Sequence, residues 1–562
     1  MEELSKAQKA RTAIATFKTL ADALILRGSY QPSGKTGQKL EDSLRQFSPE
    51  IYGSMGDARI VELKGLEYVI DRLPRGIEKC NKIVLTAQED LEGTSFEEVI
   101  PLKRRRLSYI VSEKEICFVV TRGTTEIYDI LTHLTFLNIE AKKIHAQICL
   151  RGKETCQEWH ELRKTIEKPE EPEGAELDQA IWNLSIIVGR TYKETRETYE
   201  YIEKNRENKF NSGFFRIIYS LGQRVINEER SNEEPLSINI TPSLQEILGH
   251  HRYASALSDS IKKKLIDLDL HRKPVNIVCA NMHSFRNILY GYGALTEAGI
   301  VPSDDLYEMI HQIREAGIDV DTYGEQYGFV FHGDDSGSNI DVQIIQTEKL
   351  QKKCSHPKAN IDWEYVKSHQ PVIVIMDYAF GAQAYEVMDE LLCPCSVDEQ
   401  EILFSIESIS IMGKAGILPG KKGDIMLPTA HVMEGTPHNY IVNNDLSETD
   451  FDEDVSVFNG PVVTVLGTSL QNRDVLERFH TSSWRAIGLE MEGGHYQRAI
   501  NAAIIQGHIP QTMKVRYAYY ASDNPLVSGQ TLASGPMGTD GIVSTYMISR
   551  IIIEKILQEK DG

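Results

Sequence analysis

The spacing of apolar residues along the chain changes near residue 270. Before this point, apolar residues recur mainly at the three- and four-residue intervals of amphipathic helices, as at 8–26 and in one long helix predicted at 177–203. Residues 115–121 form an apolar run that is typical of a strand. A polar, proline-containing stretch at 167–174 reads as a linker or loop. Residues 1–270 are therefore predicted to form a mostly helical domain, whose role the sequence does not reveal.

After residue 273, short apolar runs alternate with helical patterns. Each run is bounded by polar residues, as a buried strand would be. The strand-like runs are 275–280, 328–331, 372–376, 409–412, 462–466 and 515–521. The helical patterns are 304–316, 382–392, 474–479, 493–506 and 545–558. Strands that alternate with helices predict a mainly parallel sheet with helices on both faces. The fold class is thus predicted to be α/β, with an α/β/α sandwich over residues 271–562.

Composition limits the classes of partner. The 562 residues carry a formal net charge of −21, which argues against broad binding to nucleic acid or to an anionic membrane. No apolar run reaches the ~18 residues that span a bilayer, and no signal peptide is visible, so a cytoplasmic protein is expected. The eight cysteines form no disulfide framework, and Cys393 and Cys395 lack a second pair. We therefore predict neither a metal site nor a cofactor.

Two acidic motifs near the carboxyl terminus carry the candidate chemistry. Met491 stands between Glu490 and Glu492 where a helix begins, and about thirty residues later Ser522 and Asp523 end an apolar and aromatic run. A carboxylate can accept hydrogen bonds from both hydroxyls of a sugar diol, and a buried Asp at a strand end can protonate a departing purine. Structural explanations exist for both motifs: acids suit a helix amino terminus, and an Asp can cap a turn.

Together these motifs resemble the ribose and base ends of the nucleoside phosphorylase and nucleosidase superfamily. The order of elements agrees with that family over most of residues 271–562, from the strand at 275–280 through the segment at 377–384 to the two motifs. The resemblance implies that Glu492 binds the ribose 2′- and 3′-hydroxyls and that Met491 packs under the sugar. It also implies that Asp523 is the general acid and that Ser522 orients it.

Further residues are expected around the ligand. Some follow from the resemblance, whereas Lys414 stands where the family more often has a small polar residue and, together with Arg286, suggests a phosphorylated substrate. A glycine-bearing loop after the strand at 409–412 is expected to bring backbone N–H groups to the ligand, and a lysine within it suits a phosphate. The segment after the strand at 462–466 is expected to contact the base. Tight turns and a solvent-directed lysine account for the same composition. The substrate-binding candidates of this second group are Gly413, Lys414, Gly416, Leu470, Gln471, Asn524 and Arg286.

Two departures from the family pattern concern the nucleophile. Phosphorylases carry an arginine on the strand that enters the glycine loop, and Ile411 stands in that place here. Hydrolytic relatives such as methylthioadenosine nucleosidase carry a water-activating glutamate after the first strand, but residues 281–286 contain none. Either Glu490 activates the water, or nucleosidase activity is lost.

These observations predict an N-ribosyl hydrolase that converts a purine nucleoside or nucleotide to free base and ribose or phosphoribose. An extra amino-terminal domain joined to this fold is similar to the architecture of AMP nucleosidases. The resemblance further implies a homo-oligomer. Two alternatives stay open: a phosphate-dependent purine nucleoside phosphorylase, and a catalytically inactive nucleotide-binding regulatory protein. The sequence names neither the base nor the number of phosphates.

Overall fold

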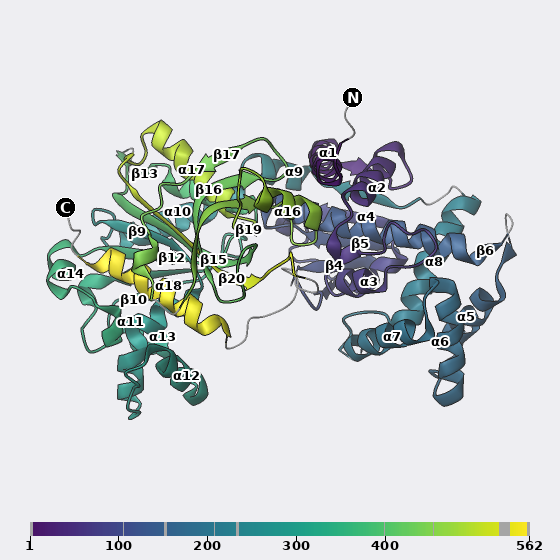
Figure 1. The fold of residues 1–562 in the computed structure, drawn as a ribbon, viewed down its shortest axis with the longest axis horizontal. Coiled ribbons are helices and arrows are strands. Elements are labelled where there is room, and N and C mark those ends of the chain that lie inside the picture. Colours follow the sequence, from purple (N-terminus) through teal and green to yellow (C-terminus); the bar gives the residue numbers. More distant parts are fainter. Residues whose placement is uncertain are drawn as a thin grey trace. The chain divides into compact units, whose positions relative to one another are not determined.

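The computed structural model describes residues 4–104, 106–150, 154–206, 208–231, 235–397, 400–452, 455–527 and 540–558 (Figure 1). The chain divides into two compact units. Unit 1 consists of Met1–His250 together with the short segment Ser469–Val475, and unit 2 consists of His251–Thr468 and Leu476–Gly562.

Helices make up most of unit 1. They are α1 (Lys6–Arg27), α2 (Lys35–Phe47), α3 (Leu63–Ile70), α4 (Gly123–Ile148), α5 (Gln157–Glu167), α6 (Gly174–Val188), α7 (Tyr192–Arg206), α8 (Phe214–Ser231) and α9 (Pro242–Gly249). The single helix predicted at 177–203 is instead the pair α6 and α7. Gly189 ends α6 with a φ of +67°, and a Cβ there would lie 2.3 Å from the Arg59 carbonyl oxygen. The chain must therefore turn at this glycine.

Unit 1 also contains a six-stranded sheet in the order β1-β8-β2-β5-β4-β3. Its strands are β1 (Ser29–Tyr30), β2 (Lys82–Thr86), β3 (Glu97–Val99), β4 (Ser108–Ser112), β5 (Glu115–Val119) and β8 (Ser237–Ile240). The apolar run at 115–121 corresponds to β5. The other strands have two to five residues, too few for a period to stand out in the sequence. A small hairpin pairs β6 (Cys149–Leu150) with β7 (Glu154–Thr155).

Unit 2 is built on a ten-stranded sheet in the order β10-β11-β12-β9-β15-β19-β18-β16-β17, with β20 paired to both β15 and β16. Its strands are β9 (Val275–Cys279), β10 (Phe329–His332), β11 (Val342–Gln346), β12 (Val372–Met376), β15 (Ile406–Ile417), β16 (Ile425–Met433), β17 (Asn439–Ile441), β18 (Val457–Thr464), β19 (Gly488–Glu490) and β20 (Lys514–Asp523). A separate hairpin pairs β13 (Cys395–Val397) with β14 (Gln400–Ile402). The sheet is mixed rather than mainly parallel, because β11 and β17 return antiparallel to their neighbours.

Five strands of unit 2 close into a ring. β15 pairs with β19, β19 with β18, β18 with β16, β16 with β20, and β20 again with β15. A ring of strands leaves no free edge among its members. The strand ends that carry the two acidic motifs both belong to this ring.

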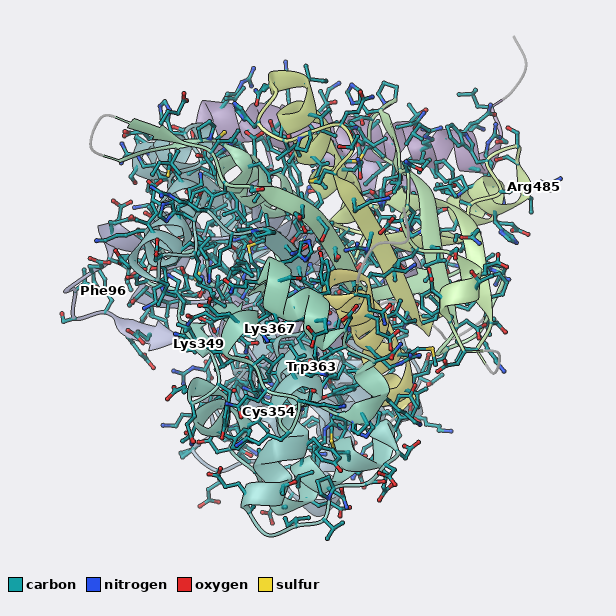
Figure 2. The ribbon with its side chains drawn as sticks, turned by 90° about the vertical axis from the view of Figure 1, so that its left-hand side faces the viewer. Phe96, Lys349, Cys354, Trp363, Lys367 and Arg485 are labelled. Carbon is teal, nitrogen blue, oxygen red and sulfur yellow. The ribbon has the colours of Figure 1, made fainter. Side chains whose placement is uncertain are left out.

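Helices cover both faces of the unit 2 sheet (Figure 1). One core lies under α10 (Arg252–Asp267), α15 (Gln383–Leu392) and α17 (Gly493–Gln506). The other lies under α11 (Met282–Glu297), α12 (Leu306–Ala316), α13 (Val320–Glu325) and α18 (Asp540–Leu557). α14 (Trp363–His369), on which Trp363 and Lys367 lie one turn apart (Figure 2), packs against α18. α16 (Arg473–Thr481) begins in the segment that belongs to unit 1. The predicted α/β class is confirmed.

Within the described ranges, no helix has the length and apolarity needed to cross a membrane. The same residues contain no group of three or more His, Cys, Asp or Glu side chains arranged to hold a metal ion.

Candidate active site

The two acidic motifs meet at the carboxyl end of β15. Gly416 pairs with Leu489 of β19 on one edge and with Asp523 of β20 on the other. Because neighbouring strands lie about 4.8 Å apart, the backbones of Leu489 and Asp523 lie only ~10 Å apart across Gly416. A Cβ on Gly416 would come within 2.8 Å of Leu489 Cδ2, so a glycine is needed for this close approach. The fold thus brings the Glu490–Glu492 turn and Asp523 to one end of one strand.

Glu490 anchors the turn between β19 and α17. Its side chain is buried, with 3% of the residue exposed. One carboxylate oxygen accepts a hydrogen bond from Thr464 Oγ1 at 2.5 Å and lies 3.3 Å from His431 Nδ1. The other accepts the backbone N–H groups of Glu492, at 2.5 Å, and of Gly493. Burial alone would raise the pKa of Glu490, but His431, Thr464 and the Gly493 amide together lower it below its ordinary value. Glu490 is therefore an ionised carboxylate whose acceptor positions are engaged.

Two adjacent glycines let α17 begin against the strands of the ring. A Cβ on Gly493 would lie 2.2 Å from His431 Cε1 and 2.3 Å from Tyr519 Oη. A Cβ on Gly494 would lie 2.6 Å from Thr464 Oγ1. Neither glycine has a positive φ, so the requirement is for space rather than for backbone freedom.

Glu492 and Met491 lie at the first turn of α17. Met491 is buried, and Glu492 is half-buried and accepts the Gly381 N–H at 3.0 Å. Burial, followed by the charge of Glu490 and more weakly that of Glu492, raises the pKa of Tyr519 well above its ordinary value. Tyr519 therefore lies close to both carboxylates and connects this turn to β20, which ends at Asp523.

Asp523 is almost completely buried, with 1% of the residue exposed. Its Oδ1 accepts a hydrogen bond from Ser522 Oγ, which also donates to the Ala415 carbonyl at 3.2 Å. Its Oδ2 has no hydrogen-bond partner among the residues that the structure describes. Burial raises the pKa of Asp523, against the smaller lowering effects of Ser522 and the Lys414 charge. A carboxyl group in this state keeps its proton to higher pH than an exposed Asp does.

The glycine-bearing segment after residue 412 is a strand and not a loop. β15 continues to Ile417 because its residues pair one by one with β20, with a register shift only between Ala415 and Gly416. The turn comes later, at 418–424. Lys414 is exposed on this strand. A Cβ on Gly413 would lie 3.5 Å from Tyr378 Cε1, an ordinary contact, so Gly413 is not required by packing.

Asn524 and Arg286, which were predicted to contact the ligand, make polar contacts within the protein. Asn524 donates to the carbonyls of Leu418 and Gly420, at 3.0 and 2.9 Å, and holds the turn that follows β15. Arg286 on α11 contacts both carboxylate oxygens of Asp321, one of them at 2.6 Å. An arginine paired in this way has much of its charge already compensated.

Leu470 and Gln471 belong to unit 1. Both are buried, and the Gln471 carbonyl accepts the Glu50 N–H at 2.9 Å. The next residue, Asn472, donates to the Phe47 carbonyl at 2.7 Å. The segment predicted to contact the base is thus held among residues of the amino-terminal unit.

Three residues of the cluster were not found from the sequence: His431, Thr464 and Tyr519. Sequence patterns indicate that a strand is buried but not which distant side chain it faces. His431 gave the one available signal, a titratable residue in an otherwise largely apolar strand, since buried polar groups usually have a specific partner.

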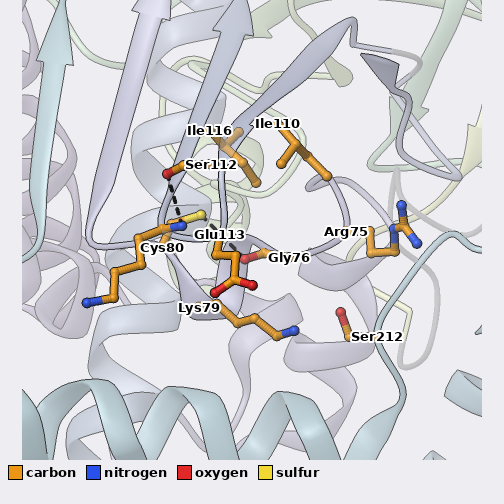
Figure 3. A pocket seen from close by; sticks show the side chains of 10 residues that line it. Arg75, Gly76, Lys79, Cys80, Ile110, Ser112, Glu113, Ile116 and Ser212 are labelled. Carbon is orange, nitrogen blue, oxygen red and sulfur yellow. Dashed lines mark hydrogen bonds between the residues drawn. The ribbon is translucent and has the colours of Figure 1, made fainter. Parts of the chain in front are cut away.

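Unit 1 contains a pocket of about 410 Å³ near the hairpin between β4 and β5 (Figure 3). Ile110 and Ile116 line it together with Lys79, Glu113 and Lys114, whose charged side chains are exposed. None of the predicted site residues lines this pocket.

A family model described as a family of unknown function, DUF6909, matches residues 38–303 and 303–558. These spans cover well over half of the chain, and the chain belongs to this family. None of the curated proteins matches its sequence.

Several solved structures are similar to about half of the chain. The 5′-methylthioadenosine/S-adenosylhomocysteine nucleosidase of Campylobacter jejuni has 10% identity and a TM-score of 0.29, with 50% of this chain and 97% of that one covered. Futalosine hydrolase of Helicobacter pylori has 10% identity and a TM-score of 0.28, covering 51% and 97%. Uridine phosphorylase of Schistosoma mansoni has 12% identity and a TM-score of 0.31, covering 53% and 90%. At these values, the function of this chain has to be argued from its own site.

Proposed function

We propose that this member of the DUF6909 family is an N-ribosyl hydrolase, which cleaves a purine nucleoside or nucleotide to free base and ribose or phosphoribose. One observation carries the proposal. Gly416 pairs with Leu489 and with Asp523, so the turn that carries the half-buried Glu492 and the buried Glu490, whose pKa is lowered, flanks the same strand end as a buried Asp523 with a raised pKa. Two carboxyl groups whose environments favour different protonation states are the usual arrangement for divided acid and binding roles.

Asp523 is assigned the role of general acid. As the bond between C1′ and N9 breaks, its electron pair goes to the purine, and the Asp523 proton is transferred to N7. Water adds to C1′ of the oxocarbenium-like sugar, and the proton that it loses restores the Asp523 carboxyl group. Because burial raises its pKa, Asp523 keeps its proton to higher pH than an exposed Asp does, and a positioned acid of this kind contributes roughly 10²–10⁴-fold in rate.

Glu492 and Met491 are assigned to the ribose. The Glu492 carboxylate is held by the Gly381 N–H and is partly exposed, so it can accept hydrogen bonds from a sugar diol. Glu490 is assigned a positioning role instead of water activation. Both oxygens of its carboxylate already accept hydrogen bonds, one from Thr464 Oγ1 and the other from two backbone amides, and His431 Nδ1 lies 3.3 Å from the first oxygen.

Hydrolysis is preferred over phosphorolysis because Ile411 stands at the place on β15 where phosphorylases carry the arginine that binds the phosphate nucleophile. Ile411 is 3% exposed and pairs with Cys279 of β9 and Tyr517 of β20. The buried Arg516 of β20 is occupied by Asp445, 2.8 Å away. Lys414 is the cation that supports a nucleotide substrate, since its charge already acts on Asp523.

A second candidate function is nucleotide binding without turnover. It is favoured by the complete engagement of Glu490 and by the lack of a glutamate at 281–286, which together leave the water activator unassigned. The fold and the ribose-binding turn would then serve recognition alone.

One experiment separates these functions. The purified full-length chain is incubated with a mixed panel of nucleosides and nucleotides, with and without inorganic phosphate, and the products are identified by mass spectrometry. Hydrolysis predicts free purine and ribose or phosphoribose in both conditions. Ribose 1-phosphate that forms only with phosphate would establish phosphorolysis, and saturable binding with intact ligand would establish the binding protein.

A further inference from the structure

His431 lies beneath the turn that carries the proposed ribose-binding residues. It belongs to β16 and is 0% exposed. Its ring packs edge-on against Tyr517 and Tyr519, with centroids 4.8 and 6.2 Å away. The only polar contact of its ring nitrogens among the described residues is the 3.3 Å approach of Nδ1 to Glu490 Oε1. A buried imidazole thus lies beside a buried carboxylate.

Glu490 connects His431 to the backbone of Glu492. Glu490 contacts His431 through one oxygen and accepts the backbone N–H groups of Glu492 and Gly493 through the other. A carboxylate that binds the first amides of a helix fixes where that helix begins. The position of the Glu492 backbone therefore depends on the position of the Glu490 side chain.

The turn before α17 leaves space for the imidazole ring of His431. Gly493 has no Cβ, and a Cβ there would lie 2.2 Å from His431 Cε1. An apolar side chain would fill the same space without the cost of burying a polar ring, so packing alone does not account for a histidine at this position. The presence of the imidazole is explained if its contact with Glu490 contributes to the function of the site.

We propose that His431 is a positioning residue for ribose recognition: through Glu490 it sets the start of α17 and thereby the placement of the Glu492 carboxylate. This inference rests on the proposed function, because it assigns His431 to the same site. Its consequence is specific. Loss of His431 should weaken the recognition of the 2′-hydroxyl more than it weakens binding of the base.

The test compares the binding of two C-nucleosides, a purine C-ribonucleoside and its 2′-deoxy counterpart, whose carbon–carbon glycosidic bonds resist hydrolysis. The full-length chain should bind the ribo form roughly 10–100-fold more tightly, as expected for hydrogen bonds to a charged group. In His431→Phe, which keeps an aromatic ring but has no ring nitrogen, this ratio should fall below about 3-fold. In His431→Asn, whose amide nitrogen takes nearly the position of Nδ1 and can approach Glu490, the ratio should stay near the wild-type value. Calorimetry gives both affinities.

A matched control is available in the same unit. His356 is also buried, and its Nε2 contacts the Ser303 carbonyl at 3.2 Å. His356→Phe should leave the ribo-to-deoxy ratio unchanged, even if it lowers stability as much as His431→Phe does. If His431→Phe does not fold, His431→Leu carries the same expectation, because it has no polar atom to approach Glu490.

The outcomes distinguish the inference from the proposed function. A wild-type chain that binds neither nucleoside overturns both. A wild-type chain that prefers the ribo form, together with a His431→Phe variant that keeps this preference, overturns only the role of His431. A preference that is lost in His431→Phe, kept in His431→Asn and kept in His356→Phe supports it.

Discussion

Replacing Gly493 by alanine would add one methyl group at the closest contact of the candidate site. The new Cβ would lie 2.2 Å from His431 Cε1, 2.3 Å from Tyr519 Oη and 2.7 Å from His431 Nδ1. Non-bonded carbon atoms normally approach to about 3.5–4.0 Å, so these groups would have to separate by more than about 1 Å. Neither ring is free to move, because both are buried and pack against Tyr517.

The magnitude follows from two opposing terms. Overpacking a close-packed core costs about 1–3 kcal/mol. Alanine gains up to about 1 kcal/mol over glycine inside a helix, and less at the first residue of α17. We therefore expect Gly493→Ala to lower the free energy of unfolding by about 1–2 kcal/mol. The ribose-binding turn would shift as well, so affinity for a ribonucleoside should fall about 10-fold or more.

Urea unfolding followed by circular dichroism measures the stability change. Gly413→Ala is the matched control, since its Cβ would meet only Tyr378 Cε1 at 3.5 Å, and its stability should stay within about 0.5 kcal/mol of wild type or improve. The reasoning is refuted if Gly493→Ala is as stable as Gly413→Ala and binds the ribonucleoside equally well.

Three further predictions concern the carboxylates and the nearby lysine. Asp523→Asn should lower kcat roughly 10²–10⁴-fold in a base-release assay. Because the pKa of Asp523 is raised in the folded state, the ionised carboxylate destabilises the fold above that pKa. The variant should therefore be more thermally stable than wild type at alkaline pH, and this gain should disappear below the ordinary Asp pKa. The rate of base release by wild type should fall as pH rises through the raised pKa of Asp523. Lys414→Met should shift this fall to higher pH, because the lysine charge lowers the pKa of Asp523. A pH profile that does not shift would show that the two groups do not interact. Glu492→Gln should lower kcat/KM at least about 10-fold for a ribonucleoside and clearly less for its 2′,3′-dideoxy analogue, and equal losses would remove Glu492 from the ribose.

Part of the fold could be predicted because buried strands are nearly continuous apolar runs. The runs at 275–280, 372–376 and 515–521 correspond to β9, β12 and β20 within a few residues. β11 gave no such signal, because Gln343 and Gln346 interrupt it and are nevertheless buried. The antiparallel direction of β11 and β17 could not be predicted either, because strand direction depends on the connections between strands rather than on composition.

The candidate site could be predicted only where one short motif contains both the residue and its setting. Asp523 ends an aromatic run, and Glu492 comes directly before the two glycines that begin α17, so local sequence indicated where each residue lies in the fold. The contact of Glu490 with His431 joins positions far apart in the chain, and no periodic pattern encodes it. The strand character of 412–417 depends likewise on residue-by-residue pairing with β20, which overrides the turn preference of its two glycines.

A crystal structure of the full-length chain with a bound purine C-ribonucleoside would test the central claim most directly. The account predicts that Asp523 Oδ2 lies within hydrogen-bond distance of the purine imidazole nitrogen and that the Glu492 carboxylate contacts both ribose hydroxyls in the same complex. A nucleoside bound elsewhere, or one that contacts neither carboxyl group, would contradict it.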